Sequence, residues 1–198
     1  MEAVMKARTI ILSILVIFLV IIAGLYVKNR EQESKVNSRI QSVAEEEVEN
    51  RIQEYINEWE GKTIPTLNVM DLSGREVSIP AKNGKYTVYV VWASWCPDCQ
   101  RELSILNKLY DEYLDKVNFI SISLVGFRDE TIDSASNYYN KEGFKFPILF
   151  DMNKRVFSSL DIKAIPTVYL VNKDGVIEKV IVESVGEAEF SSILKAAS

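Results

Sequence analysis

Cys96 and Cys99 constrain this chain more than any other feature, because they are its only two cysteines in 198 residues and only two residues separate them. A nearly continuous run of β-branched and aromatic residues predicts a buried strand over 86–92, just before the pair. Apolar residues at helical spacing predict a helix over 97–114. Both sulfurs are then held at a helix N-terminus, close enough to form and break one disulfide. This spacing predicts redox chemistry, and the alternative is two buried cysteines that only fill space.

The composition of the chain excludes several classes of function. Its net charge of −5 argues against nucleic-acid binding, which needs a basic face. The absence of histidine removes Ser-His and Cys-His catalytic pairs and the commonest metal ligand. Because there is no third cysteine, a four-cysteine metal site is also excluded. We expect no metal and no bound cofactor, only a redox-active disulfide between Cys96 and Cys99.

An apolar segment near the N-terminus, Ile10 to Val27, is interrupted only by Ser13 and Gly24 and carries no charge. It is close to the minimum length of a transmembrane helix. A cleaved signal peptide is the alternative, but the segment is long for one, its end is a poor cleavage site, and no cysteine follows for a lipid anchor. We therefore predict an uncleaved signal anchor with one transmembrane helix over residues 1–30.

Residues 31–60 are polar and acidic, with nine Glu against three Lys or Arg, a net charge of −6. Their apolar residues recur mostly three or four apart, which is helical spacing, and Gly61 is a residue that commonly follows a helix. We predict a solvated helical spacer. A short coiled coil that dimerises the chain is the alternative, which the break between Val43 and Val48 weakens.

The pattern changes at Gly61, and we predict a third part, a folded domain over residues 61–198. Its first predicted buried strand, over 86–92, precedes the cysteines, and the helix over 97–114 begins between them. Turn residues separate the elements that follow. The other predicted elements are a hairpin over 67–79, a strand over 117–125, a helix over 131–141, an extended piece over 146–150, a short helix over 153–160, a hairpin of strands over 167–171 and 176–182, and a helix over 187–197.

Two segments of the predicted domain resemble the thioredoxin superfamily. Residues 92–99, WASWCPDC, are similar to its active-site segment, and Ile165-Pro166-Thr167 is similar to its cis-proline loop. The hairpin before the first strand, the helix over 131–141 and the N-terminal anchor narrow the resemblance to the membrane-anchored TlpA/ResA-like thiol-disulfide oxidoreductases. It covers about residues 64–197.

The resemblance implies a thioredoxin-like three-layer α/β fold with a central mixed sheet, preceded here by the transmembrane helix and the helical spacer. It also implies a single-pass protein of the cytoplasmic membrane whose catalytic domain is extracytoplasmic. Lys and Arg are more numerous after the apolar segment than before it, which alone would favour the opposite orientation. We follow the resemblance on this point.

The resemblance also implies which residues bind the substrate. A cis bond before Pro166 would turn the backbone of Ile165 toward the cysteines, where in this superfamily it pairs with an extended substrate peptide. Trp95, Pro97 and Asp98 surround the cysteines in the sequence and complete the predicted substrate-binding set. The alternative for Pro166 is an ordinary proline at the start of a strand.

The chain departs from the thioredoxin pattern at Val90 and at the dipeptide Pro97-Asp98, which replaces Gly-Pro. Where thioredoxin has a buried aspartate before its motif, this chain has Val90, which exchanges no proton. Glu102 lies one helical turn after Cys99, where the ResA-like branch carries an acid. We therefore predict that Glu102 transfers the proton for the cysteine pair, with a pKa raised by burial. A surface glutamate is the alternative.

The catalytic roles follow from position on the helix. We expect Cys96, nearer the helix start, to attack a substrate disulfide and Cys99 to resolve the mixed disulfide. The charge of Asp98 opposes a thiolate, which favours a reductase over a strong oxidant.

The predicted function is a membrane-tethered oxidoreductase that mainly reduces disulfides of extracytoplasmic proteins, apocytochrome c among the candidates. By resemblance, its electrons come from a membrane thiol donor of the CcdA type. The alternatives are a thiol peroxidase on the same fold, and a non-catalytic membrane-anchored binding module with a static disulfide.

Overall fold

The computed structural model describes residues 2–197, and within α1 (Glu2–Trp59) it describes the side chains of residues 15, 18, 19, 21, 22 and 24 onward. Among these described residues, no helix has an apolar stretch that would cross a membrane. The predicted span Ile10–Val27 lies partly outside them. The chain divides into two compact units between Arg51 and Ile52.

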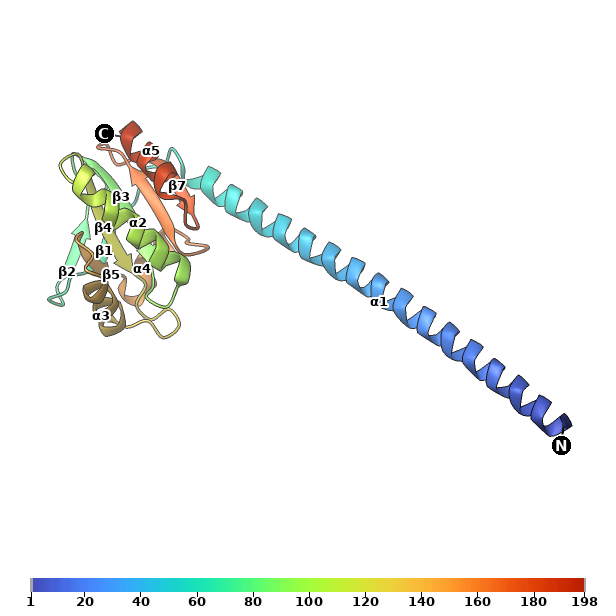
Figure 1. Cartoon of the computed structure of the whole chain (residues 1–198). Coiled ribbons are helices and arrows are strands. Elements are labelled where there is room, and N and C mark those ends of the chain that lie inside the picture. Colours follow the sequence, from blue (N-terminus) through green and yellow to red (C-terminus); the bar gives the residue numbers. More distant parts are fainter. Residues whose placement is uncertain (1, 198) are drawn as a thin grey trace. The chain divides into compact units, whose positions relative to one another are not determined.

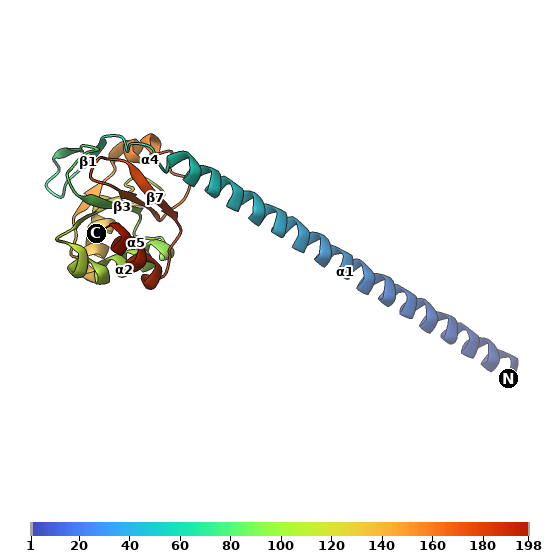
Figure 2. The same ribbon diagram turned by 90° about the horizontal axis from the view of Figure 1, so that it is seen from above.

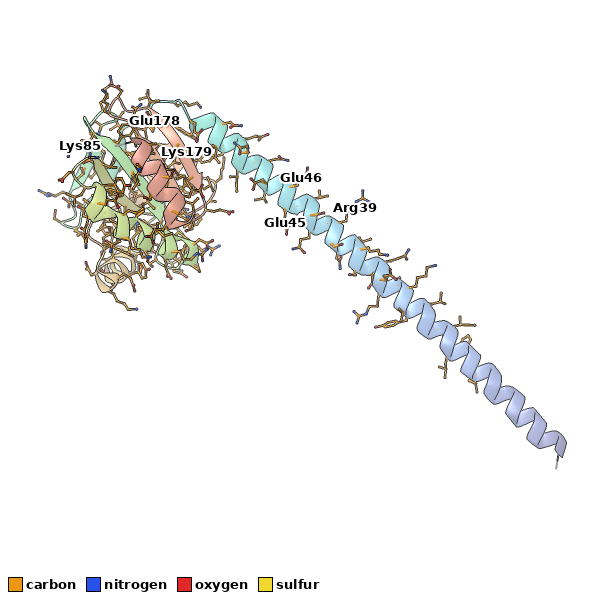
Figure 3. All side chains as sticks on the ribbon, turned by 45° about the horizontal axis from the view of Figure 1, so that its top comes forward. Arg39, Glu45, Glu46, Lys85, Glu178 and Lys179 are labelled. Atoms are coloured by element: carbon orange, nitrogen blue, oxygen red, sulfur yellow. A yellow bond between two sulfur atoms is a disulfide. The ribbon has the colours of Figure 1, made fainter. Side chains whose placement is uncertain are left out.

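The first unit is the greater part of helix α1. Between Leu25 and Arg51 its side chains are exposed, and Arg39, Glu45 and Glu46 project from it (Figure 3). Ion pairs one turn apart, such as Glu31 with Lys35 at 2.6 Å, contribute only a little to helix stability because water screens them. The helix ends at Trp59, and Gly61 follows with φ of +84°.

The second unit is built on one seven-stranded sheet with the order β2-β1-β5-β4-β3-β6-β7 (Figure 1). Strand β3 pairs in parallel with β4 and antiparallel with β6, so the sheet is mixed. The strands are β1 (Leu67–Met70), β2 (Glu76–Ile79), β3 (Tyr86–Trp92), β4 (Val117–Ser123), β5 (Ile148–Phe150), β6 (Thr167–Val171) and β7 (Ile177–Val182).

Helices cover both faces of the sheet. Side chains of α2 (Pro97–Tyr113), α3 (Ile132–Glu142) and α5 (Glu187–Ala197) pack on one face. The 3-10 helix η1 (Met152–Lys154) leads into α4 (Arg155–Ser159), which packs on the other face. Figure 2 shows α4 on one side of the strands and α2 and α5 on the opposite side. The predicted thioredoxin-like α/β fold with a central mixed sheet is confirmed.

Burial on both faces of the sheet explains the apolar run from Val88 to Trp92 in strand β3. Val88, Val90 and Trp92 face the core under α2, whereas Tyr89 and Val91 face the core under α4. Side chains alternate along a strand, so a strand buried on both faces needs apolar residues at every position. Its carboxyl end, where the cysteine segment begins, lies beside the carboxyl end of the parallel strand β4.

The last turns of α1 belong to the second unit because they are packed into it. Tyr55 is buried, and its hydroxyl donates a hydrogen bond to the carbonyl of Leu160 at 3.0 Å. Glu60 accepts a hydrogen bond from the N–H of Val180 at 3.1 Å and lies 3.8 Å from the ammonium of Lys179. These contacts attach the end of the helix to β7 and to the end of α4.

Candidate active site

The two cysteines lie at the N-terminal end of α2, the helix that follows β3 in the chain. Cys96 is the N-cap of α2 and Pro97 is its first residue, a position that suits proline because the first N–H of a helix has no partner within it. Cys96 and Cys99 form a disulfide with their Cα atoms 5.2 Å apart. The structure therefore holds the oxidised form of the pair.

The two sulfurs have different surroundings. Cys96 is 5% exposed, whereas Cys99 is completely buried. The backbone N–H of Cys99 donates to Sγ of Cys96 at 3.2 Å, and the N-terminal end of α2 adds its partial positive charge. Both effects stabilise a thiolate on Cys96 once the disulfide is open.

Asp98 places a negative charge in the same helix turn. Its carboxylate forms an ion pair with the guanidinium of Arg101, three residues along α2, and both side chains are about half exposed or more. The arginine offsets part of the charge that the aspartate brings to the thiols. The effect of Asp98 on the thiolate is therefore smaller than its position in the sequence alone suggests.

The loop before β6 comes close to Cys96. The peptide bond between Ile165 and Pro166 is cis, and the carbonyl oxygen of Ile165 lies 3.7 Å from Sγ of Cys96. The carbonyl of Pro166 accepts a hydrogen bond from the N–H of Glu183 at 3.1 Å, and the hydroxyl of Thr167 donates to the carbonyl of Ala164 at 2.7 Å. These bonds fix the loop in place beside the disulfide.

The peptide N–H of Ile165 has no hydrogen-bond partner within the described part of the chain. Ile165 is half-buried, and it borders the groove beside Cys96 described below. An unpaired backbone N–H in a loop beside the disulfide can pair with the backbone of an extended peptide.

Glu102 lies one turn after Cys99 and is completely buried, so it is not a surface glutamate. Its Oε2 accepts a hydrogen bond from the hydroxyl of Ser184 at 2.8 Å. Burial raises the pKa of Glu102, and the hydrogen bonds from Ser184 and the N–H of Val185 lower it in part. Its Oε1 has no hydrogen-bond partner among the described residues. Val90, which stands where thioredoxin has an aspartate, is also fully buried, and its side chain has no group that titrates.

Glu130 was not anticipated from the sequence. It is buried in the loop between β4 and α3, and its Oε2 accepts hydrogen bonds from the N–H of Ser94 at 2.9 Å and from its hydroxyl at 2.8 Å. The side-chain amide of Gln100 donates to the carbonyl of Ser94 at 2.7 Å. The side chains of Glu130 and Gln100 thus fix the turn that precedes Cys96. No local sequence pattern marks this role of Glu130, because Ser94 lies 36 residues earlier in the chain.

A groove of about 300 Å³ opens beside Cys96. Rings of Trp95, Phe127 and Phe157 line it, with Trp95 stacked on Phe127 at a centroid distance of 6.1 Å. The predicted substrate-binding residues Trp95, Pro97 and Ile165 all border this groove, whereas Pro166 is buried and does not line it. Asp98 is absent from its lining.

Within the part of the chain that the structure describes, no three Cys, Asp or Glu side chains gather in a way that would hold a metal ion. The site contains the two sulfurs of Cys96 and Cys99, and the carboxyl of Glu102 lies on the same helix, α2.

Residues 59–196 match the Redoxin family. The thiol-disulfide oxidoreductase ResA of Bacillus thuringiensis (strain Al Hakam) is 33% identical over 129 residues, which cover 64% of this chain and 72% of ResA. The thioredoxin-like protein YneN of Bacillus subtilis is 27% identical over 135 residues, or 68% of this chain and 78% of YneN. The crystal structure of StoA from Bacillus subtilis matches with a TM-score of 0.56 and 27% identity, over 66% of this chain and 98% of StoA. The chain therefore belongs to the Redoxin family, and it is a ResA-like thiol-disulfide oxidoreductase of the thioredoxin superfamily.

Proposed function

We propose that this oxidoreductase works as a membrane-tethered reductase of disulfides in extracytoplasmic proteins. The observation that carries the proposal is the position of Cys96, at the N-terminus of α2 and 3.7 Å from the backbone of the cis-proline loop. A sulfur activated by the helix end thus lies next to a backbone segment with which a substrate peptide can pair.

The reaction begins from the dithiol form. The thiolate of Cys96 attacks one sulfur of the substrate disulfide, whose S–S bond breaks, and the other substrate sulfur leaves as a thiolate and takes a proton. Cys99 then loses its proton and attacks Sγ of Cys96. The mixed disulfide breaks, the second substrate thiol is released, and two electrons have passed to the substrate. The protein is left with the disulfide between Cys96 and Cys99.

Glu102 is our candidate for the group that takes and returns the proton of Cys99. Its burial one turn along α2, and an Oε1 without a partner among the described residues, support this role. A carboxyl whose pKa is raised exchanges protons with a thiol more readily than an ordinary one, because the two proton affinities come closer.

The substrate peptide pairs with the free N–H of Ile165 and lies along the surface formed by Trp95, Pro97 and Asp98. The stacked ring of Trp95 gives this surface a rigid apolar part. Pro166 contributes the cis bond that turns Ile165 toward the sulfur.

The tether is the apolar segment Ile10–Val27, and it places the catalytic domain on the extracytoplasmic side of the cytoplasmic membrane. A membrane dithiol donor of the CcdA type returns two electrons to the disulfide between Cys96 and Cys99. Disulfides of apocytochrome c are candidate substrates. No bound cofactor takes part.

Insulin reduction by the full-length chain tests the proposed reaction. The wild type is expected to reduce insulin in the presence of dithiothreitol, Cys96→Ser to be inactive, and Cys99→Ser to accumulate a mixed disulfide through Cys96. Equal turnover by wild type and Cys96→Ser would contradict the proposal and favour a static disulfide. Consumption of hydrogen peroxide without insulin reduction would favour a thiol peroxidase. A mixed disulfide trapped only in Cys96→Ser would exchange the roles of the two cysteines.

The direction of electron flow is tested by the redox potential of the cysteine pair. A value near that of thioredoxin, about −270 mV, agrees with a reductase, whereas a value near that of DsbA, about −120 mV, contradicts it. Protease added outside spheroplasts is expected to digest residues 61–198, and complete protection would contradict the orientation.

A further inference from the structure

The groove beside Cys96 carries positive charge as well as aromatic rings. The guanidinium of Arg128 lies 4.3 Å from the centroid of the Trp95 ring, and Lys163 also borders the groove. The ammonium of Lys154 lies 5.9 Å from the ring of Phe127. Cations therefore collect next to the reactive sulfur, in a chain whose net charge is −5.

Arg128 is held in position by its surroundings. Its side chain stacks on Trp95, Trp95 stacks on Phe127, and Phe127 contacts Phe157 at a centroid distance of 5.5 Å. A guanidinium over an indole ring is attracted to the ring face, which limits how far the side chain moves. The N–H groups of Arg128 are therefore available to a ligand that enters the groove.

Arg128 forms no ion pair within the described part of the chain. Lys163 pairs with Asp161, and Arg101 pairs with Asp98. In contrast, no carboxylate of the described residues forms an ion pair with Arg128 or with Lys154. A planar guanidinium binds a carboxylate through two parallel hydrogen bonds, and this geometry suits Arg better than Lys.

We propose that the groove binds an acidic side chain of the substrate, an aspartate or glutamate that flanks the reacting cysteine. The proposal rests on the function above, because it requires the substrate peptide to run past Ile165. In an extended peptide, a residue two positions from the cysteine points to the same side as the sulfur that meets Cys96. The carboxylate of that residue then meets Arg128 over the ring of Trp95.

Peptide disulfides of defined charge test this preference. Eight-residue peptides with one cysteine are oxidised to symmetrical dimers, with Glu, Gln or Lys two positions before or after the cysteine. The reduced full-length chain is mixed with each dimer, and released peptide thiol is followed after acid quenching. Of the two Glu dimers, the one that is reduced faster is compared with the dimer that has Lys at the same position. At low salt the wild type is expected to reduce this Glu dimer about fivefold faster, which is the ratio that one partly screened ion pair gives.

Variants at residue 128 test whether Arg128 in the groove causes the preference for the Glu dimer over the Lys dimer. Arg128→Gln is expected to bring the Glu-to-Lys ratio close to one, and Arg128→Glu to invert it. Lys82→Glu is the matched control for Arg128→Glu, because both change the net charge by two, but Lys82 is exposed before the amino end of β3, away from the cysteines. It should keep the wild-type ratio.

Different failures have different meanings. A wild type that reduces insulin and every dimer at one rate overturns the groove proposal alone, as does an Arg128→Gln variant that keeps the preference. A preference abolished equally by Lys82→Glu also overturns it, because the general field of the protein is then responsible. If the wild type reduces neither insulin nor any dimer, the proposed function itself fails.

Discussion

The hydroxyl of Ser184 donates a hydrogen bond to Oε2 of Glu102 at 2.8 Å, and this bond ties the segment between β7 and α5 to the helix that carries the cysteines. Because the carboxyl is buried, the bond has two consequences. It stabilises the fold, and it lowers the pKa of a carboxyl that burial otherwise raises.

Ser184→Ala is therefore expected to raise the pKa of Glu102 further. The hydrogen bond favours the ionised carboxylate, so without it the neutral form persists to higher pH. The titration is followed in the full-length reduced protein by the NMR shift of the ¹³C-labelled glutamate carboxyl. The free energy of unfolding should fall by about 1 kcal/mol. Ser192→Ala, on the exposed part of α5, is the control. A lower pKa in Ser184→Ala would show that the bond favours the neutral form.

Glu102→Gln is expected to change how stability depends on pH. The folded state binds the proton of Glu102 more tightly than the unfolded state does, because burial raises the pKa. The stabilisation from this group is complete below the ordinary glutamate range and is lost as pH rises toward the raised value. The stability of Glu102→Gln relative to wild type should therefore increase as the pH rises above the ordinary glutamate range, about pH 4.

Urea unfolding at several pH values measures this difference. The pKa of the buried Asp151 is also raised by burial, but Asp151 is present in both proteins and its contribution cancels. Glu112→Gln, on the exposed side of α2, is the matched control and should follow the wild-type profile. Parallel profiles for Glu102→Gln and wild type would mean that the carboxyl is not perturbed.

The secondary structure and the cysteine site could be read from local patterns. The strand predicted over 86–92 is observed as Tyr86–Trp92, and the helix predicted over 97–114 as Pro97–Tyr113. Burial on both faces leaves a continuous apolar run, and a helix with one buried face leaves a 3.6-residue period. These patterns depend only on residues that are close in the sequence. They were therefore sufficient to predict the strand and the helix without knowledge of any tertiary contact.

The surroundings of the site depend on distant residues and were not predictable in the same way. Glu102 lies on the apolar face of α2, yet its burial is decided by α5 and by Ser184, about eighty residues later. The partners of Glu130 and the stack of Arg128 on Trp95 also join separate loops. Tyr55 lies within the predicted spacer, residues 31–60, whose apolar residues have helical spacing. In the structure, its hydroxyl contacts Leu160 and the residue belongs to the folded unit.

Glu130→Gln is expected to loosen the turn before Cys96. A neutral amide accepts the two hydrogen bonds of Ser94 less strongly than the buried carboxylate does, so the free energy of unfolding should fall by about 1–3 kcal/mol. Insulin reduction should slow as well, because Cys96 is less well positioned. Ser94→Ala removes only the hydroxyl bond and should have a smaller effect on both.

Asp129→Asn controls for the loss of one negative charge in the same loop, since Asp129 is exposed. If it slows insulin reduction as much as Glu130→Gln does, then charge in the loop is responsible and the buried hydrogen bonds are not.

Tyr55→Phe tests whether the end of α1 is part of the folded unit. Burial raises the pKa of Tyr55 to about 12, so its hydroxyl stays protonated at neutral pH and donates to Leu160, beside the hydroxyl of Tyr169. Removing it leaves the buried Leu160 carbonyl without that donor, and the midpoint of urea unfolding should fall by the equivalent of about 1–3 kcal/mol. Tyr86→Phe, whose hydroxyl bonds Glu178 near the surface, should cost much less because water replaces that bond.

A double-mutant cycle with Tyr169→Phe separates the two contacts of Tyr55. Tyr169→Phe leaves the bond from Tyr55 to Leu160 intact, so it should destabilise the protein less than Tyr55→Phe does. The losses of unfolding free energy in the two single variants should not add in the double variant. The two hydroxyls bond each other, so each single change already breaks that bond. An unfolding midpoint that Tyr55→Phe leaves unchanged would mean that the last turns of α1 unfold independently of the sheet, because their buried hydrogen bonds would then contribute nothing to the transition.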